Sequence, residues 1–175
     1  MSTSPSDQEL WDAFVGTKRE MHRRQAEFYQ QATDKTAILR TALSPAAGAW
    51  HQGTALDFLS SFNHDTTSLL PELMPLAMSH RWLRAAQDAI AHVPLDRLLP
   101  VLEPLFLTEL AAAEDDDYWY LASLAARLQA WSLLEQVVRQ AEESSNPEVR
   151  ESAQYFVATY GPMWTAGPTP ADPIP

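Results

Sequence analysis

Residues 69–76 read Leu-Leu-Pro-Glu-Leu-Met-Pro-Leu, and residues 98–105 read Leu-Leu-Pro-Val-Leu-Glu-Pro-Leu. Both copies follow the pattern Leu-Leu-Pro-x-Leu-x-Pro-Leu, and an amphipathic segment at residues 79–93 lies between them. A pattern that recurs at this spacing is typical of stacked helices, because each helix is too small to bury its apolar face without its neighbours. We therefore expect an all-α fold in which helices of similar length repeat along the chain.

The regular pattern continues to the C-terminal side of the two copies. Apolar residues at helical spacing predict six helices, near residues 69–78, 80–93, 95–112, 116–129, 131–144 and 147–160. Pro75 and Pro104 lie inside two of these helices, where each removes one backbone hydrogen bond. Asn146 is a suitable N-cap for the last helix, and Gly161-Pro162 predicts its end.

The first 68 residues are less regular. Ser6 and Glu9 form a Ser-x-x-Glu capping box, which predicts a helix that begins there and extends to Tyr29. Beyond it the sequence predicts short helices at residues 33–43 and 54–62, a loop at 44–53 and a polar break at 63–68. The polar break separates an irregular N-terminal part from the regular part.

The regular part resembles HEAT-type α-helical repeats. The similarity covers roughly residues 69–160 and rests on helix pairs of this length, a proline in the first helix of a pair and a buried aliphatic seam. Residues 145–150, Ser-Asn-Pro-Glu-Val-Arg, are similar to the Asp-Pro-x-Val-Arg start of a repeat helix. The resemblance implies a right-handed α-solenoid with a binding surface in place of a catalytic centre. Together with the irregular N-terminal helical part, we expect about eight to nine helices.

Length and composition favour one domain. The chain has 175 residues and no cysteine, so disulfides and thiolate metal sites are excluded. We expect a single domain over residues 1–175, with an N-terminal helical part at 6–68, a repeat part at 69–161 and a disordered, proline-rich tail at 162–175. No secretory signal or membrane-spanning segment is visible, which favours a cytoplasmic protein.

The net charge of −11 is unevenly distributed. Basic and acidic side chains balance over residues 1–40, so residues 41–175 carry the whole acidic excess. Such a surface repels nucleic acid and anionic lipid and attracts a basic partner protein. The alternative explanation is that the charge serves solubility alone.

The strongest candidate site is a run of four carboxylates followed by three aromatic residues: Glu114, Asp115, Asp116, Asp117, Tyr118, Trp119 and Tyr120. Carboxylates are favoured at a helix start, so capping and core packing could account for the run. Three successive aromatics cannot all face one core, however, because neighbouring residues on a helix are about 100° apart. An exposed aromatic beside carboxylates is typical of an interface with a basic protein.

No catalytic or cofactor-binding motif is visible. The five histidines lack the spacing of a helical metal site, and no glycine-rich phosphate loop or nucleophile motif occurs. We therefore expect no enzyme activity, no metal and no cofactor.

The sequence thus predicts a non-catalytic protein-binding module, most concretely an immunity-type or antitoxin-type inhibitor of a basic partner. The alternative is a small-molecule-binding protein with an aromatic groove between helices. Candidate lining residues for that groove are Trp50, Trp82, Trp119 and Trp131.

Overall fold

A computed structural model describes residues 4–165, and over this range the chain forms nine α-helices and two 3-10 helices, with no β-strand. The all-α prediction is therefore confirmed. The predicted disordered tail lies mostly outside the described residues, at 166–175. The α-helices are α1 (Asp7–Gln31), α2 (Lys35–Leu43), α3 (Ala49–Ser61), α4 (Leu70–Ala77), α5 (Leu83–Ala91), α6 (Leu95–Ala111), α7 (Asp115–Arg127), α8 (Trp131–Glu142) and α9 (Pro147–Thr165). The 3-10 helices are η1 (Pro45–Ala47) and η2 (Asn63–Leu69).

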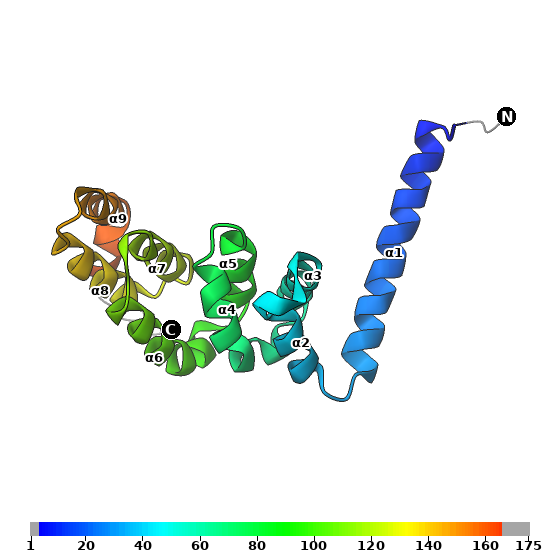
Figure 1. Cartoon of the computed structure of the whole chain (residues 1–175), viewed down its shortest axis with the longest axis horizontal. Helices are drawn as coiled ribbons and strands as arrows, with labels where there is room; N and C mark the ends of the chain where they lie inside the picture. The colour runs from blue at the N-terminus through cyan, green and yellow to red at the C-terminus, as the bar shows by residue number, and fades with distance from the viewer. Residues whose placement is uncertain (1–3, 166–175) are drawn as a thin grey trace, which may run out of the picture.

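Helices α2 to α9 lie in an extended row, and α1 stands apart from it at one end (Figure 1). Helices that follow each other along the chain pack together, as α2 does with α3, α4 with α5 and α8 with α9. In addition, α3 packs against α5, α5 against α7 and α7 against α9. The odd-numbered helices α3, α5 and α7 therefore bury their apolar faces both against a sequence neighbour and against the next odd-numbered helix.

The two Leu-Leu-Pro-x-Leu-x-Pro-Leu copies place matched leucines in the core. Leu73 and Leu102 occupy the same position in the two copies, and both are completely buried. The copies differ in their place within a helix, because the first begins α4 whereas the second lies inside α6. Pro75, Pro100 and Pro104 are inside helices but exposed to solvent. Water can therefore solvate the carbonyl groups that lack a helical partner.

Most helix ends agree with the sequence patterns. Ser6 and Glu9 form the predicted capping box, with the Ser6 backbone N–H donating to Glu9 Oε2 at 2.7 Å. Asn146 caps α9, since its Oδ1 accepts from the Glu148 N–H at 2.9 Å. The segment predicted as a polar break at 63–68 is the 3-10 helix η2, which buries Thr66 and Leu69.

Two predicted helix starts differ from those in the structure. Helix α3 begins at Ala49, five residues before the predicted cap Thr54, because the chain turns at Gly48 and Gln52 Nε2 bonds back to the carbonyl of Leu43 at 3.2 Å. Helix α5 begins at Leu83, later than predicted, since the preceding residues form turns.

The sequence predicts that the last helix ends at Gly161-Pro162, and this prediction is wrong. Helix α9 continues through Pro162 to Thr165. A proline in a helix loses one backbone hydrogen bond, but its fixed φ is compatible with helical geometry. Trp164 is partly buried against the core, and this packing holds the last turn in place.

The turn at Gly48 provides a first prediction. Gly48 has φ 79° and ψ 167°, a conformation that residues with a side chain rarely adopt. We expect Gly48→Ala to lower the free energy of unfolding by about 1–2 kcal/mol in chemical denaturation. Gly16→Ala is the matched control, because a Cβ at Gly16 meets nothing within 4 Å and Gly16 lies in a helix interior, where alanine is favoured. Equal effects of the two substitutions would contradict the assigned turn.

Candidate functional site

The predicted carboxylate run lies at the start of α7. Asp117 has a structural role, since its Oδ2 accepts from the Glu114 N–H at 3.0 Å in a capping box. Glu114, Asp115 and Asp116 are exposed. Among residues 4–165, no lysine or arginine forms an ion pair with any of the four carboxylates. Their negative charge is therefore available to the surroundings.

The three aromatic residues that follow have different environments. Tyr118 is half-buried, and its hydroxyl accepts from Gln140 Nε2 at 3.1 Å. Tyr120 is also half-buried. Trp119 is 40% exposed, and its ring lies 5.4 Å from Tyr155 and 5.1 Å from Phe156. Only Trp119 therefore presents a large aromatic surface to solvent, held in place by rings of α9.

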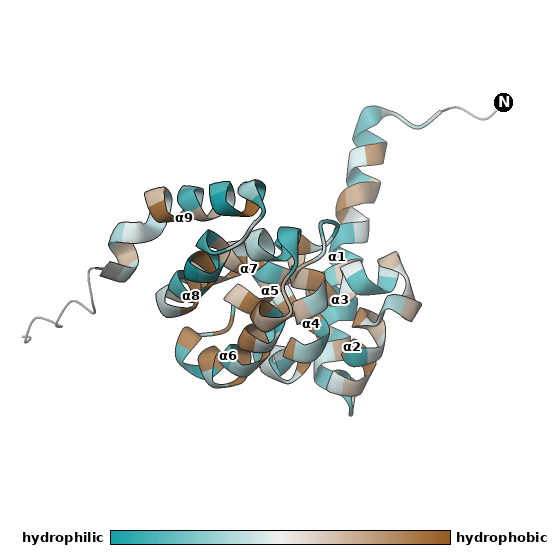
Figure 2. Cartoon of the chain, turned by 60° about the vertical axis from the view of Figure 1, so that its left-hand side comes forward, coloured by the Kyte–Doolittle hydropathy of each residue, from teal (hydrophilic) through white to brown (hydrophobic). Residues whose placement is uncertain are grey.

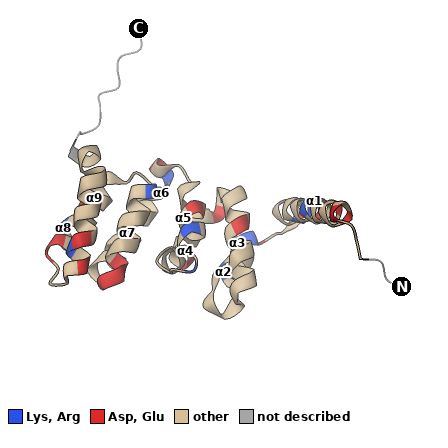
Figure 3. Cartoon of the chain, turned by 90° about the horizontal axis from the view of Figure 1, so that it is seen from above, with Lys and Arg blue, Asp and Glu red and all other residues tan. Residues whose placement is uncertain are grey.

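Further carboxylates gather at this end of α7. The bond between Gln140 and Tyr118 places the end of α8 beside the start of α7, and α9 begins after a short connection. Acidic residues accordingly appear at the start of α7 and where α8 meets α9 (Figure 3). We call this exposed set the acidic edge: Glu114, Asp115, Asp116, Glu142, Glu143 and Glu148. Neither of the nearby arginines forms an ion pair with it, since Arg139 pairs with Glu135 and Arg150 donates to the Ser144 carbonyl.

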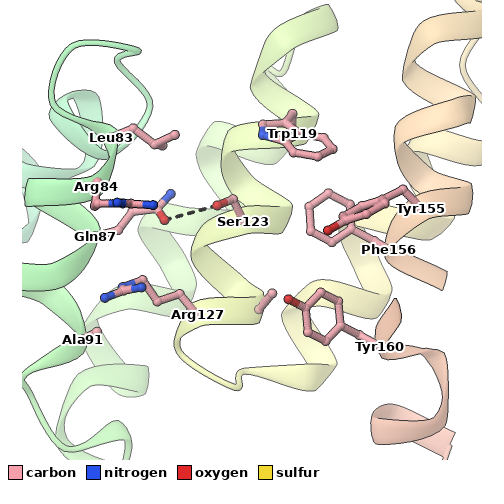
Figure 4. A pocket seen from close by; sticks show the side chains of 11 residues that line it. Leu83, Arg84, Gln87, Ala91, Trp119, Ser123, Arg127, Tyr155, Phe156 and Tyr160 are labelled. Atoms are coloured by element: carbon pink, nitrogen blue, oxygen red, sulfur yellow. Dashed lines mark hydrogen bonds between the residues drawn. The ribbon is translucent and has the colours of Figure 1, made fainter. Parts of the chain in front are cut away.

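Next to the acidic edge, a groove of about 570 Å³ crosses α5, α7 and α9. One wall is aromatic, and the opposite wall is polar (Figure 4). The aromatic wall consists of Trp119, Tyr155, Phe156 and Tyr160. The polar wall includes Arg84, Gln87, Ser123 and Arg127. Trp119 belongs to both the predicted run and the groove, so the two form one continuous surface.

Most polar groups of this groove have partners within the chain. Arg127 forms an ion pair with Asp88, and Ser123 Oγ donates to Gln87 Oε1 at 3.3 Å. Arg84 has no carboxylate partner among the described residues. The groove can therefore offer stacking surfaces and one uncommitted guanidinium group to a bound group. Residues 4–165 contain no group of three or more metal-ligating side chains that could hold an ion.

The four tryptophans of the alternative prediction do not share one groove. Trp119 lines the groove just described, whereas Trp50 and Trp82 line a second groove of about 1090 Å³ between α1, α2 and α3. Trp131 packs against Tyr160, with ring centroids 6.0 Å apart, and lines neither groove.

No protein-family model matches this chain, no curated protein is significantly similar to it, and no solved structure matches it. Within the described part of the chain, no helix is both long enough and apolar enough to cross a membrane.

Sequence reasoning missed a set of glutamines that join helices along the row. Gln52, Gln87 and Gln140 each donate to a carbonyl at the C-terminal end of an earlier helix, namely that of Leu43, Ala77 and Leu110. The signal was present in the sequence, because Gln87 follows Leu83 by four residues and precedes Ile90 by three, on the apolar face of its helix. A polar side chain on such a face has to find a buried partner.

Proposed function

We propose that this protein is a non-catalytic binding module that recognises a basic partner protein through the acidic edge and Trp119. The observation that carries the proposal is the exposed set of carboxylates without ion pairs beside a half-exposed tryptophan. Charges that lack an internal partner steer a partner of opposite sign, and a tryptophan next to them can supply most of the binding free energy.

The environment of Trp119 supports this role. Its ring is packed against Tyr155 and Phe156, so its orientation is fixed before a partner binds. A side chain that is already ordered loses little conformational entropy on binding. The groove behind it could accept an apolar or aromatic side chain of the same partner.

We further propose that α2/α3, α4/α5, α6/α7 and α8/α9 are HEAT-like pairs in a right-handed solenoid. The packing of successive odd-numbered helices against each other supports this arrangement. In the most concrete form, the protein is an immunity-type or antitoxin-type inhibitor, and the acidic edge covers a cationic active site of its partner.

A pull-down with matched variants tests the proposal. We expect Asp116→Lys combined with Trp119→Ala to abolish capture of a basic partner that the wild-type protein retains. The control is Asp96→Lys combined with Trp50→Ala, which makes the same chemical changes away from the acidic edge and Trp119; Asp96 is exposed on α6, and Trp50 is 87% exposed and lies outside the site. We expect this control to capture the partner as the wild-type protein does, because it leaves every carboxylate of the edge in place.

Circular dichroism should show the same helix content for both variants. If the Asp116→Lys, Trp119→Ala variant still captures the partner, the assigned surface is wrong.

A small-molecule-binding function is the second candidate, and the aromatic wall of the 570 Å³ groove favours it. Tryptophan fluorescence titrated with a panel of metabolites distinguishes the two functions. A ligand in this groove would change the emission of wild-type protein but not that of Trp119→Phe, whereas a surface for a protein partner would give no response to the panel.

A further inference from the structure

Helix α1 lacks cover over most of its length. It has 25 residues, none of them buried, and it projects away from the other helices (Figure 1). Only its C-terminal end is anchored: the rings of Phe28 and Phe58 lie 5.1 Å apart, those of Tyr29 and Phe62 4.7 Å apart, and Gln25 Nε2 donates to Asp57 at 2.9 Å. The N-terminal half of α1 is therefore a helix without tertiary contacts.

This uncovered half carries large apolar side chains. Leu10 is 55% exposed, Trp11 59% and Phe14 53%, and apolar residues are visible along the projecting part of α1 in Figure 2. An uncovered helical segment of about a dozen residues is only marginally stable in water without packing. A cluster of exposed apolar residues of this size marks a surface that another molecule covers.

The exposed stripe continues into the second groove. Leu10, Phe14, Met21 and Phe28 lie on one face of α1, because their spacings correspond to whole helical turns. Met21 and Phe28 line the groove of about 1090 Å³, whose other wall includes Ile38, Trp50 and Trp82. The stripe and the groove thus form one continuous apolar surface.

The charges at the two ends of this surface are complementary. Asp7, Glu9 and Asp12 lie at the start of α1 and have no lysine or arginine partner among residues 4–165; hydrogen bonds from Ser6 hold the pKa of Glu9 below its ordinary value. At the groove, Lys18 and Arg81 have no carboxylate partner in the same range, and the one carboxylate of the lining, Asp57, accepts a hydrogen bond from Gln25. An acidic, apolar segment and a cationic, apolar groove are therefore present on the same chain.

The acidic segment cannot reach the groove of its own chain. Residues 7–31 form one unbroken helix, and Lys18 of the groove belongs to that same helix. Asp12 and Asp7 are consequently fixed about 9 and 16 Å from Lys18 along the axis of a rigid helix. A second copy of the chain has no such constraint.

We propose that two copies of this protein form a symmetric dimer in which the α1 helices cross antiparallel. Residues 7–15 of each copy lie in the groove of the other, with Leu10, Trp11 and Phe14 against its apolar wall. Asp7 and Asp12 approach Lys18 and Arg81 of the other copy. Because the contact is two-fold symmetric, it forms twice and closes without further growth.

Charge reversal tests the pairing directly. Light scattering coupled to gel filtration should give the wild-type protein twice its chain mass of 19.6 kDa. Asp7→Lys with Asp12→Lys makes both partner surfaces positive, and Lys18→Glu with Arg81→Glu makes both negative. We expect each of these variants to be a monomer, because like charges then face each other in both contacts. Glu9 is left unchanged, since it is part of the capping box of α1.

Mixing the two monomeric variants in equal amounts should restore a dimer. In that heterodimer both contacts again pair opposite charges, which a folding defect could not reproduce. Asp96→Lys with Glu103→Lys, on the exposed side of α6, is the charge-matched control and should remain dimeric. Trp11→Ala should raise the dissociation constant of the dimer roughly 30-fold, as expected for a central tryptophan.

Three results would overturn the proposal. The first is a wild-type protein that is monomeric at about 100 μM chain concentration, where even a weak, micromolar dimer is populated. The second is a variant that stays dimeric after either charge reversal. The third is an equal mixture of the two variants that stays monomeric. The dimer should be unaffected by Asp116→Lys with Trp119→Ala, so this test is independent of the partner-binding surface.

Discussion

Replacing Leu102 by alanine is expected to lower the free energy of unfolding by about 2–5 kcal/mol. Leu102 is completely buried in α6 and belongs to the second copy of the repeated leucine pattern. The substitution removes apolar contacts and leaves a cavity that the surrounding helices fill only in part. Chemical denaturation followed by circular dichroism measures the change.

One control variant and one comparison variant are needed to interpret the effect of Leu102→Ala. Val101 is the next residue but is 40% exposed, so Val101→Ala should change the free energy of unfolding by less than about 0.5 kcal/mol. Leu73 occupies the matched position in the first copy and is equally buried, so Leu73→Ala should have an effect similar to that of Leu102→Ala. A neutral Leu102→Ala would show that the repeated leucines do not form the core.

Much of the helical fold could be predicted because its signals are local. Apolar spacing, capping residues and prolines depend on neighbours within a few positions, and they located α6, α8 and the start of α9 within one or two residues. The capping box at Ser6 and Glu9 is the clearest case, because both partners lie within one helical turn.

The boundaries that could not be predicted depend on distant contacts. Gln52 ties α3 to the end of α2, and this bond brings the start of α3 forward to Ala49. Trp164 packs against the core and keeps Pro162 inside α9. A polar residue on an apolar face indicates that a buried partner exists, but sequence patterns do not identify which distant group that partner is.

In the candidate site, too, local features could be predicted from the sequence and features that depend on distant contacts could not. The run from Glu114 to Tyr120 is contiguous and could be recognised in the sequence. Glu143 and Glu148 join it only because α7, α8 and α9 pack side by side. The aromatic wall likewise needs Tyr155 of α9 to reach Trp119 of α7, which depends on the register between two helices. Helical spacing defines a face of each helix but not the residue opposite it.

Replacing Gln87 by leucine is expected to lower the free energy of unfolding by about 3 kcal/mol. Gln87 is buried in α5, and it joins α5 to both α4 and α7. Its Nε2 donates to the Ala77 carbonyl at 3.4 Å and to the Tyr120 carbonyl at 3.3 Å, and its Oε1 accepts from Ser123 at 3.3 Å. Leucine has a volume similar to that of glutamine, so the decrease in the free energy of unfolding measures mainly the cost of leaving polar groups without a hydrogen-bond partner.

Ala77 is the last residue of α4, and its carbonyl has no helical partner of its own. A leucine at position 87 would leave this buried acceptor unsatisfied, which costs more than the hydrogen bond itself contributes. Gln136→Leu is the matched control, because Gln136 is exposed and bonds only to Ser132 of its own helix, so the change should stay within about 0.5 kcal/mol. If denaturation gave equal midpoints for the two variants, the three bonds of Gln87 could not be what holds α4, α5 and α7 together. A lower midpoint for Gln87→Leu alone would mean that one buried amide stabilises the packing of α4, α5 and α7, the helices that carry and support the groove beside Trp119.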